Sequence, residues 1–163
     1  MLYFSYGSNM SSKRIRQRVP SAEFIAVSTL SMHELRFHKS SKDGSAKCDA
    51  FETRDQNSIV IGVVFEVSEP EKLELDRVEG LGFGYDEKIV VVTSTNGESM
   101  KASTYYATDI EPSRKPYHWY KEHVVRGAKE NGLPAHYVEN IATIESVADP
   151  KPGRHESEMA IYC

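Results

Sequence analysis

Apolar residues come early in the chain and in short runs, and this pattern predicts that strands precede most of the helices. Residues 2–6 are mainly apolar and aromatic, and residues 7–9 (GSN) interrupt them. Such a stretch predicts a short strand, a turn and then a helix that Ser8 or Asn9 caps. We expect Pro20 to end this first helix.

The middle of the chain continues with strands and a single short helix. Residues 24–39 are rich in strand-forming types, and the run SIVIGVVFEV at 58–67 is typical of a central strand. Residues 68–71 (SEPE) have the S-x-x-E capping pattern with an early proline, so a helix should begin there and end at Gly80. Two further strand-like runs flank residues 96–97 (NG), which predicts a hairpin.

The last third of the chain has a helical pattern. One helix is predicted over 116–130 with a stop at 131–132 (NG), and Pro134 should begin another that reaches about Val147. This order of elements predicts an α+β fold, either a small mixed β-barrel or a curved sheet with flanking helices. We expect a single domain over 1–147 and a C-terminal tail, rich in proline, glycine and charge, over 148–163.

Composition narrows the classes of function. The chain has 163 residues, 39% hydrophobic and 27% charged, which suits one globular domain. Its net charge of −4 argues against nucleic acid as a partner. Cys48 and Cys163 form no C-x-x-C pair, so we expect free thiols in the cytoplasm. We expect neither a signal peptide nor a membrane span, and no metal site, because the six histidines lack metal-ligand spacing.

The turn after the first strand is the first candidate for chemistry. Backbone N–H groups of a Gly-Ser-Asn turn that leads into a helix can bind a carboxylate or phosphate. An ordinary strand-to-helix turn is the simpler alternative from the local pattern alone. A basic cluster lies close by on the predicted first helix and could strengthen a field that attracts anions; its members are Lys13, Arg14, Arg16 and Arg18.

Glu79 is the second candidate, within LDRVEGLGFGY at 75–85. It falls in the last turn of the predicted helix, where the backbone carbonyls disfavour an ionised carboxylate. Asp76 lies on the same helix face, and Phe83 and Tyr85 could bury the group further. These surroundings would suit a general acid–base residue, whereas the alternative is a solvated glutamate at a frayed helix end.

The third candidate is PYHWY at 116–120. Its aromatic residues could line a pocket or form part of the core, since Tyr117 and Tyr120 share a helix face. The pattern favours the core for Tyr117 and Trp119.

Several motifs in order give the chain a resemblance to the gamma-glutamylcyclotransferase family. The motifs are YFSYGSNM, PSAEFIAVSTL, GVVFEV, LDRVEG followed by Gly84-Tyr85, and GAKENGLPAHYVENIATIE. Together they extend over about residues 2 to 145. The resemblance implies a small mixed β-barrel with helices outside it and a reaction that needs no cofactor.

The activity that the resemblance implies is an intramolecular cyclisation within glutathione metabolism. The α-amine of a γ-glutamyl substrate attacks its own γ-carbonyl and releases 5-oxoproline with the free amine or amino acid. Glu79 matches the family's general acid–base residue. The residues that match the substrate-binding positions are Tyr3, Phe4, Ser5, Tyr6, Gly7, Ser8, Tyr85 and Tyr120.

Some features leave alternatives open. Lys47 and Cys48 stand in AKCDAFET at 46–53, where many family members have a glycine-rich strand, and this difference bears on substrate choice. The leaving group could be an alkyl amine such as the ε-amine of lysine. A binding module that senses γ-glutamyl metabolites is the rival class, and the presence of Glu79 favours the enzyme. The sequence leaves open whether the protein is a monomer or a homodimer.

Overall fold

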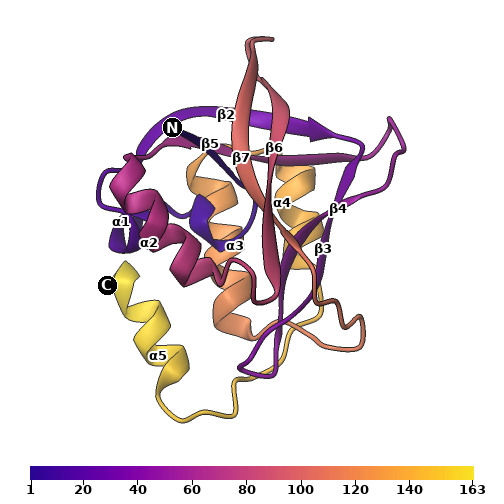
Figure 1. The fold of residues 1–163 in the computed structure, drawn as a ribbon. Helices are drawn as coiled ribbons and strands as arrows, with labels where there is room; N and C mark the ends of the chain where they lie inside the picture. Colours follow the sequence, from indigo (N-terminus) through magenta and orange to yellow (C-terminus); the bar gives the residue numbers. More distant parts are fainter.

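Five strands close into a barrel, and two more strands form a separate sheet beside it (Figure 1). A computed structural model describes all 163 residues. The barrel strands are β1 (Leu2–Ser5), β5 (Ile59–Glu66), β2 (Glu23–Ser31), β6 (Tyr85–Ser94) and β7 (Ser99–Ala107), in the order in which they pair. The second sheet pairs β3 (His33–Ser40) with β4 (Ala46–Glu52).

Helices cover the barrel on the outside. They are the short 3-10 helix η1 (Ser8–Met10), α1 (Ser12–Arg18), α2 (Glu69–Glu79), α3 (His118–Glu130), α4 (Ala135–Ala142), α5 (Arg154–Met159) and the 3-10 helix η2 (Ala160–Tyr162). In Figure 1 α1 and α2 lie on one side of the barrel, and the C-terminal α5 lies below them. The barrel with outer helices confirms the predicted α+β fold. No helix has both the length and the apolar character needed to span a bilayer.

β1 closes the barrel and carries the first site residues into it. It pairs antiparallel with β5 and makes a parallel contact with β7 at Tyr3 and Ser103. Gly62 of β5 is required at this crossing, because a Cβ there would lie 2.3 Å from the Ser5 carbonyl oxygen and 2.8 Å from the Phe4 ring. Phe4 is fully buried against this glycine, so its side chain belongs to the core.

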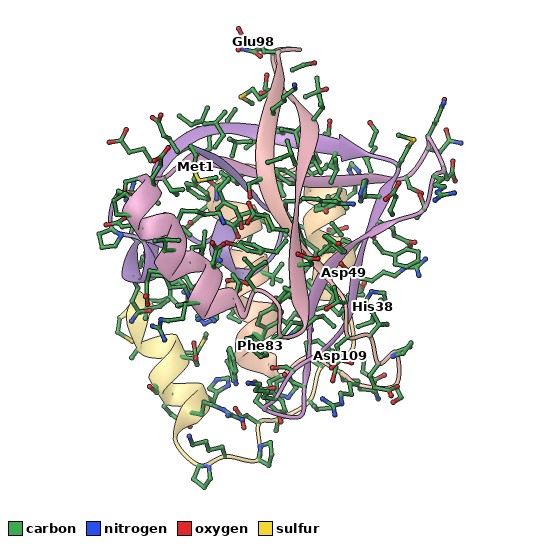
Figure 2. The ribbon with its side chains drawn as sticks, in the orientation of Figure 1. Met1, His38, Asp49, Phe83, Glu98 and Asp109 are labelled. Carbon is green, nitrogen blue, oxygen red and sulfur yellow. The ribbon has the colours of Figure 1, made fainter.

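The two-stranded sheet is attached to the barrel through buried polar groups. Nε2 of His38 on β3 lies 2.7 Å from Oδ2 of Asp49 on β4. The backbone N–H of Ala107 on β7 donates to Oδ1 of the same aspartate at 2.8 Å. Figure 2 shows His38 and Asp49 beside the lower part of the β6–β7 hairpin. The carboxylate therefore fixes β4 against the barrel, and β4 contributes a wall of the site described below.

The first helical region differs from the prediction. Ser8 and Asn9 do not cap a long helix, because they form the separate turn η1. Ser11 caps α1 instead, and its Oγ accepts a hydrogen bond from the Arg14 N–H at 3.4 Å. The strand-rich region 24–39 is divided into β2 and β3 at Met32, which has a φ of 61°.

Later elements follow the sequence more closely. α2 ends at Glu79, and Gly80 has the left-handed conformation expected of a C-terminal glycine, with a φ of 76°. The side chain of Ser68 makes no capping hydrogen bond, so the predicted capping box is wrong. The hairpin at residues 96–97 is confirmed between β6 and β7.

The end of the last predicted helix lies earlier than expected. α4 stops at Ala142 and does not reach Val147. Backbone pairing explains the difference, because the Val147 N–H donates to the Pro116 carbonyl at 3.0 Å and the His118 N–H donates to the Val147 carbonyl at 2.9 Å. The following residues 148–163 contain α5 and η2. The domain boundary at residue 147 stays a prediction.

Candidate active site

The end of β1, the turn η1 and the end of α2 surround a small cavity of about 30 Å³. Its lining residues are Tyr3, Ser5, Tyr6, Gly7, Ser8, Asn9, Cys48, Glu79, Tyr85, Tyr105 and Tyr120. Every residue that the sequence suggested for the site lines this cavity except Phe4. Asn9 and Tyr105 were missed, and Cys48 was considered only as a difference from the family.

The turn after β1 presents polar groups that have no partner within the protein. The hydroxyl of Ser5 is buried and makes no hydrogen bond. The backbone N–H of Gly7 also has no acceptor in the protein. A Cβ at Gly7 would lie 3.2 Å from Cβ of Cys48 and 3.4 Å from the Tyr120 hydroxyl, so glycine lets the turn approach these walls closely. The cavity thus offers donors to a ligand at this turn.

Glu79 is anchored through one of its two carboxylate oxygens. Oε1 accepts hydrogen bonds from Nη1 of Arg18 and from Nδ2 of Asn9, each at 2.8 Å. Oε2 makes no hydrogen bond within the protein. The side chain is 16% exposed, so it is largely shielded from solvent and still reachable. A carboxylate that is held by one oxygen and free at the other is suited to proton transfer.

The surroundings of Glu79 differ from those that the sequence suggested. Asp76 accepts a hydrogen bond from the Tyr105 hydroxyl at 2.5 Å, and Phe83 is 77% exposed and buries nothing. The neighbour that the sequence did not reveal is Arg18, whose Nη1 forms an ion pair with Glu79 at 2.8 Å. It lies 61 residues away along the chain, so no local pattern connects the two.

Tyrosine hydroxyls form most of the polar lining of the cavity. The Tyr85 hydroxyl donates to the Cys48 carbonyl and the Tyr6 hydroxyl donates to the Tyr105 carbonyl, each at 2.6 Å. The Tyr120 oxygen accepts from the Cys48 N–H at 3.0 Å, and its own proton has no acceptor in the protein. Burial raises the pKa of Tyr6, Tyr85 and Tyr120 well above the ordinary value. All three are therefore neutral donors at physiological pH.

Cys48 and Lys47, the two differences from the family pattern, point to different surroundings. Cys48 lines the cavity, and burial raises the pKa of its thiol to about 12. The thiol is therefore protonated and a poor nucleophile. Lys47 is absent from the lining, because its Nζ donates to Asp43 at 3.0 Å and lies 4.5 Å from the centre of the Tyr120 ring. It supports the tyrosine from behind.

The C-terminal segment reaches the turn through Arg14. Nε of Arg14 donates to the Ser8 hydroxyl at 3.2 Å, and Nη1 donates to Oε2 of Glu158 at 2.7 Å. Nε2 of His123 lies 3.0 Å from the same carboxylate oxygen. Burial alone would raise the pKa of Glu158, but the His123 and Arg14 contacts outweigh it and lower the pKa to about 2. The predicted tail is thus tied to the turn by a buried ion pair.

The sequence motif GAKENGLP supports the same turn from the other side. A Cβ at Gly127 of α3 would lie 2.5 Å from the backbone nitrogen of Ser11, so only glycine permits this packing. The Asn131 amide donates to the Met10 carbonyl at 2.9 Å. The motif therefore packs against the end of η1 through Gly127 and Asn131.

Comparisons with known proteins agree on one family. Residues 59–141 match the model of the AIG2-like family. The gamma-glutamylcyclotransferase of Homo sapiens is 36% identical over 148 residues, which cover 88% of this chain and 78% of that protein. The gamma-glutamylcyclotransferase of Bos taurus is 35% identical over 150 residues, with the same coverage of both chains. A solved gamma-glutamyl cyclotransferase structure superposes with a TM-score of 0.87 at 32% identity, over 99% of this chain and 97% of that one.

Proposed function

Since the chain belongs to the AIG2-like family and is a member of the gamma-glutamylcyclotransferases, we propose that it cyclises γ-glutamyl amines or amino acids. The substrate's α-amine nitrogen forms a bond to its own γ-carbonyl carbon. The bond from that carbon to the leaving nitrogen breaks, and 5-oxoproline and the free amine are the products. One proton passes from the attacking nitrogen to the leaving one, and nothing is oxidised or reduced, so the reaction needs no cofactor.

Glu79 is the proposed general acid–base residue. The observation that carries this proposal is its carboxylate geometry, with Oε1 anchored by Arg18 and Asn9 and Oε2 free in a cavity of suitable polarity. Oε2 takes the proton from the attacking amine and then gives it to the leaving amine. Arg18 and Asn9 hold Oε1 and so fix the orientation of the carboxylate for both steps.

The turn after β1 is the proposed holder of the glutamyl group. The Ser5 hydroxyl, the Gly7 N–H and the Tyr120 hydroxyl have donor capacity to spare, and this suits a carboxylate or a developing oxyanion. Tyr3, Tyr6, Ser8 and Tyr85 supply the remaining contact surface, and Phe4 acts only through packing. Folding the substrate so that its amine meets its own carbonyl is a proximity effect.

The cellular setting is also a proposal. The free thiols of Cys48 and Cys163 are consistent with a reducing cytoplasm, where we expect the protein to act on small molecules. The assembly is either a monomer or a homodimer, and light scattering after size-exclusion chromatography would distinguish the two by mass.

The activity is tested by 5-oxoproline release from γ-glutamyl-alanine, glutathione and ε-(γ-glutamyl)-lysine. No product from any of the three would contradict the proposed function, and product from the third alone would identify an amine-specific enzyme. Glu79→Gln should leave the fold intact and lower turnover by at least ~100-fold. Glu69→Gln, an exposed glutamate at the start of the same helix, is the matched control and should keep full turnover.

A further inference from the structure

Glu79 faces a second hollow in addition to the cavity. A cleft of about 420 Å³ lies between the β3–β4 connection and the end of α2, and Glu79 lines this cleft as well as the cavity. Lys39, Lys42 and Phe83 are among its other lining residues. Figure 2 shows Phe83 just beyond the end of α2. Glu79 therefore lies where the small cavity and the larger cleft meet.

Most charged side chains around the cleft are already paired. Arg77 forms an ion pair with Glu74, and Asp76 forms one with Lys72. Glu79 itself is paired with Arg18, outside the cleft lining. Lys39 and Lys42 make neither an ion pair nor a hydrogen bond. The unpaired charge at this cleft is therefore positive.

Lys39 is the more informative of the two lysines. The residue is only 8% exposed, and its Nζ lies 4.7 Å from the centre of the Tyr85 ring. Gly84 leaves room for the side chain, since a Cβ there would lie 2.9 Å from Cε of Lys39. Burial lowers the pKa of Lys39, and the carboxylates of Glu79, Asp109 and Asp43 oppose this shift from a distance without forming an ion pair with the ammonium group. A buried cation that lacks a partner is costly, and an anion in the cleft would relieve the cost.

The rim of the cleft adds a cation and an apolar surface. Lys42 is exposed, and its Nζ lies 5.8 Å from the centre of the Phe83 ring. Phe83 is 77% exposed, although a large aromatic side chain gains by burial. A ligand with a carboxylate and a carbon skeleton would match both side chains.

We propose that Lys39 and Lys42 form a leaving-group subsite that binds the carboxylate of an amino acid or peptide. The inference rests on the proposed function, in which Glu79 protonates the leaving nitrogen. With the glutamyl group in the enclosed cavity, the leaving nitrogen lies at Glu79 and its substituent extends into the cleft. The enzyme then selects γ-glutamyl amino acids and peptides over γ-glutamyl alkyl amines because only the former carry the carboxylate close to the leaving nitrogen.

A matched substrate pair tests the subsite. γ-Glutamyl-L-alanine and γ-glutamyl-L-alaninamide have nearly the same shape and differ in the charge of the leaving group. The wild-type protein should favour the acid by at least about 10-fold in kcat/KM, as a charged hydrogen bond would provide. Raising the salt concentration from about 0.05 to about 0.5 M should reduce the preference, since the Lys42 charge is exposed to screening.

Variants of the two lysines test whether these residues cause the preference for the acid. Lys39→Met should lower kcat/KM for the acid by about 10- to 100-fold and for the amide by no more than about 2-fold. Lys42→Met should also lower kcat/KM for the acid and not for the amide, but by a smaller factor of about 2- to 5-fold. Lys101→Met, on the exposed face of β7, is the control and should change neither value.

The outcomes separate the subsite from the reaction. No turnover of either substrate by the wild-type protein would remove the proposed function itself. Equal kcat/KM for the two substrates would overturn the subsite and leave the function standing. An equal loss on both substrates in Lys39→Met would also overturn it, because the lysine would then act on the fold or on Glu79. If that variant does not fold, the wild-type preference and Lys42→Met still decide the question.

Discussion

Arg14 and Arg18 lie one turn apart on α1, and their partners give them different tasks. Arg14 is 6% exposed and pairs with Glu158 from the C-terminal segment. Arg18 has a side chain that is 22% exposed and pairs with Glu79 at the edge of the cavity. Both also donate to the turn η1, Arg14 to the Ser8 hydroxyl and Arg18 to the side-chain amide oxygen Oδ1 of Asn9. One short helix therefore holds the turn with two cations.

The difference between the two pairs teaches how stability and activity are divided in this molecule. The Arg14 side chain is 7% exposed and its partner Glu158 is 28% exposed, so breaking this pair leaves a buried cation or a partly shielded carboxylate without its partner. In the Arg18 pair both side chains are partly exposed, and we expect the pair to be worth less to the fold. Its carboxylate, however, is the group proposed to move the proton. We therefore expect an arginine-to-methionine substitution to lower mainly the free energy of unfolding at Arg14 and mainly the activity at Arg18.

The largest effect is expected for Arg14→Met. Loss of the guanidinium leaves the Glu158 carboxylate half-buried without its cation, and the free energy of unfolding should fall by about 3 kcal/mol. Urea denaturation measures this change. Arg16→Met, at an exposed position on the same helix, is the control and should stay within about 0.5 kcal/mol of the wild type. Equal losses in both variants would remove the special role of the buried pair.

Arg18→Met should lower activity strongly and stability only slightly. Glu79 loses its charged donor on Oε1, so kcat/KM for 5-oxoproline release should fall by about 10- to 30-fold while stability falls by less than about 1 kcal/mol. Kinetics and urea denaturation on the same preparation measure both. A variant that is fully active but strongly destabilised would reverse the comparison between the two arginines.

Acid should weaken the Arg14 pair through Glu158. Its pKa in the folded protein is about 2, below the ordinary value of 4.5, so between these values the unfolded state binds a proton that the folded state does not. The stability that this group contributes is therefore complete above pH 4.5 and is lost as the pH falls towards 2. Glu158→Gln should be less stable than the wild type at pH 7, and the difference should shrink in acid. A difference that is constant from pH 7 to pH 3 would contradict this origin.

The smallest effect concerns the cavity wall. Tyr120→Phe removes the acceptor for the Cys48 N–H, and stability should fall by about 1 kcal/mol. Tyr117→Phe is matched to it, because the Tyr117 hydroxyl donates to the Asp43 carbonyl outside the cavity. Both variants should lose similar stability, and only Tyr120→Phe should raise KM. A raised KM in both variants would contradict a specific contact between the Tyr120 hydroxyl and the substrate.

Local signals in the sequence placed Glu79, the residue proposed for proton transfer, at the end of a helix, and the resemblance suggested its role. Pro70 and Gly80 define the limits of α2, and the helix end that follows from them is the position of Glu79. The residues around the first turn were found through the family resemblance, and all but Phe4 line the cavity. Phe4 was the exception because alternate residues of a strand point to opposite sides.

What the sequence could not reveal are the pairings between distant residues. Arg18 meets Glu79, and Tyr105 meets Asp76, only because the barrel and helices bring them together. The ordered C-terminal segment was missed for the same reason. α5 has only six residues and a charged sequence, so its position depends on Glu158 meeting Arg14 and not on helix propensity.

The link between Arg14 and Glu158 has a consequence for how the protein is made. The two residues are 144 positions apart in the chain, so the first is synthesised long before the second. β1 must also wait for β5 and β7 before it can pair. During translation Arg14 therefore stays solvated until α3 and the C-terminal segment have been made, and chaperones would meet this region in that open form. The part of the molecule that is translated first is among the last to reach its final environment.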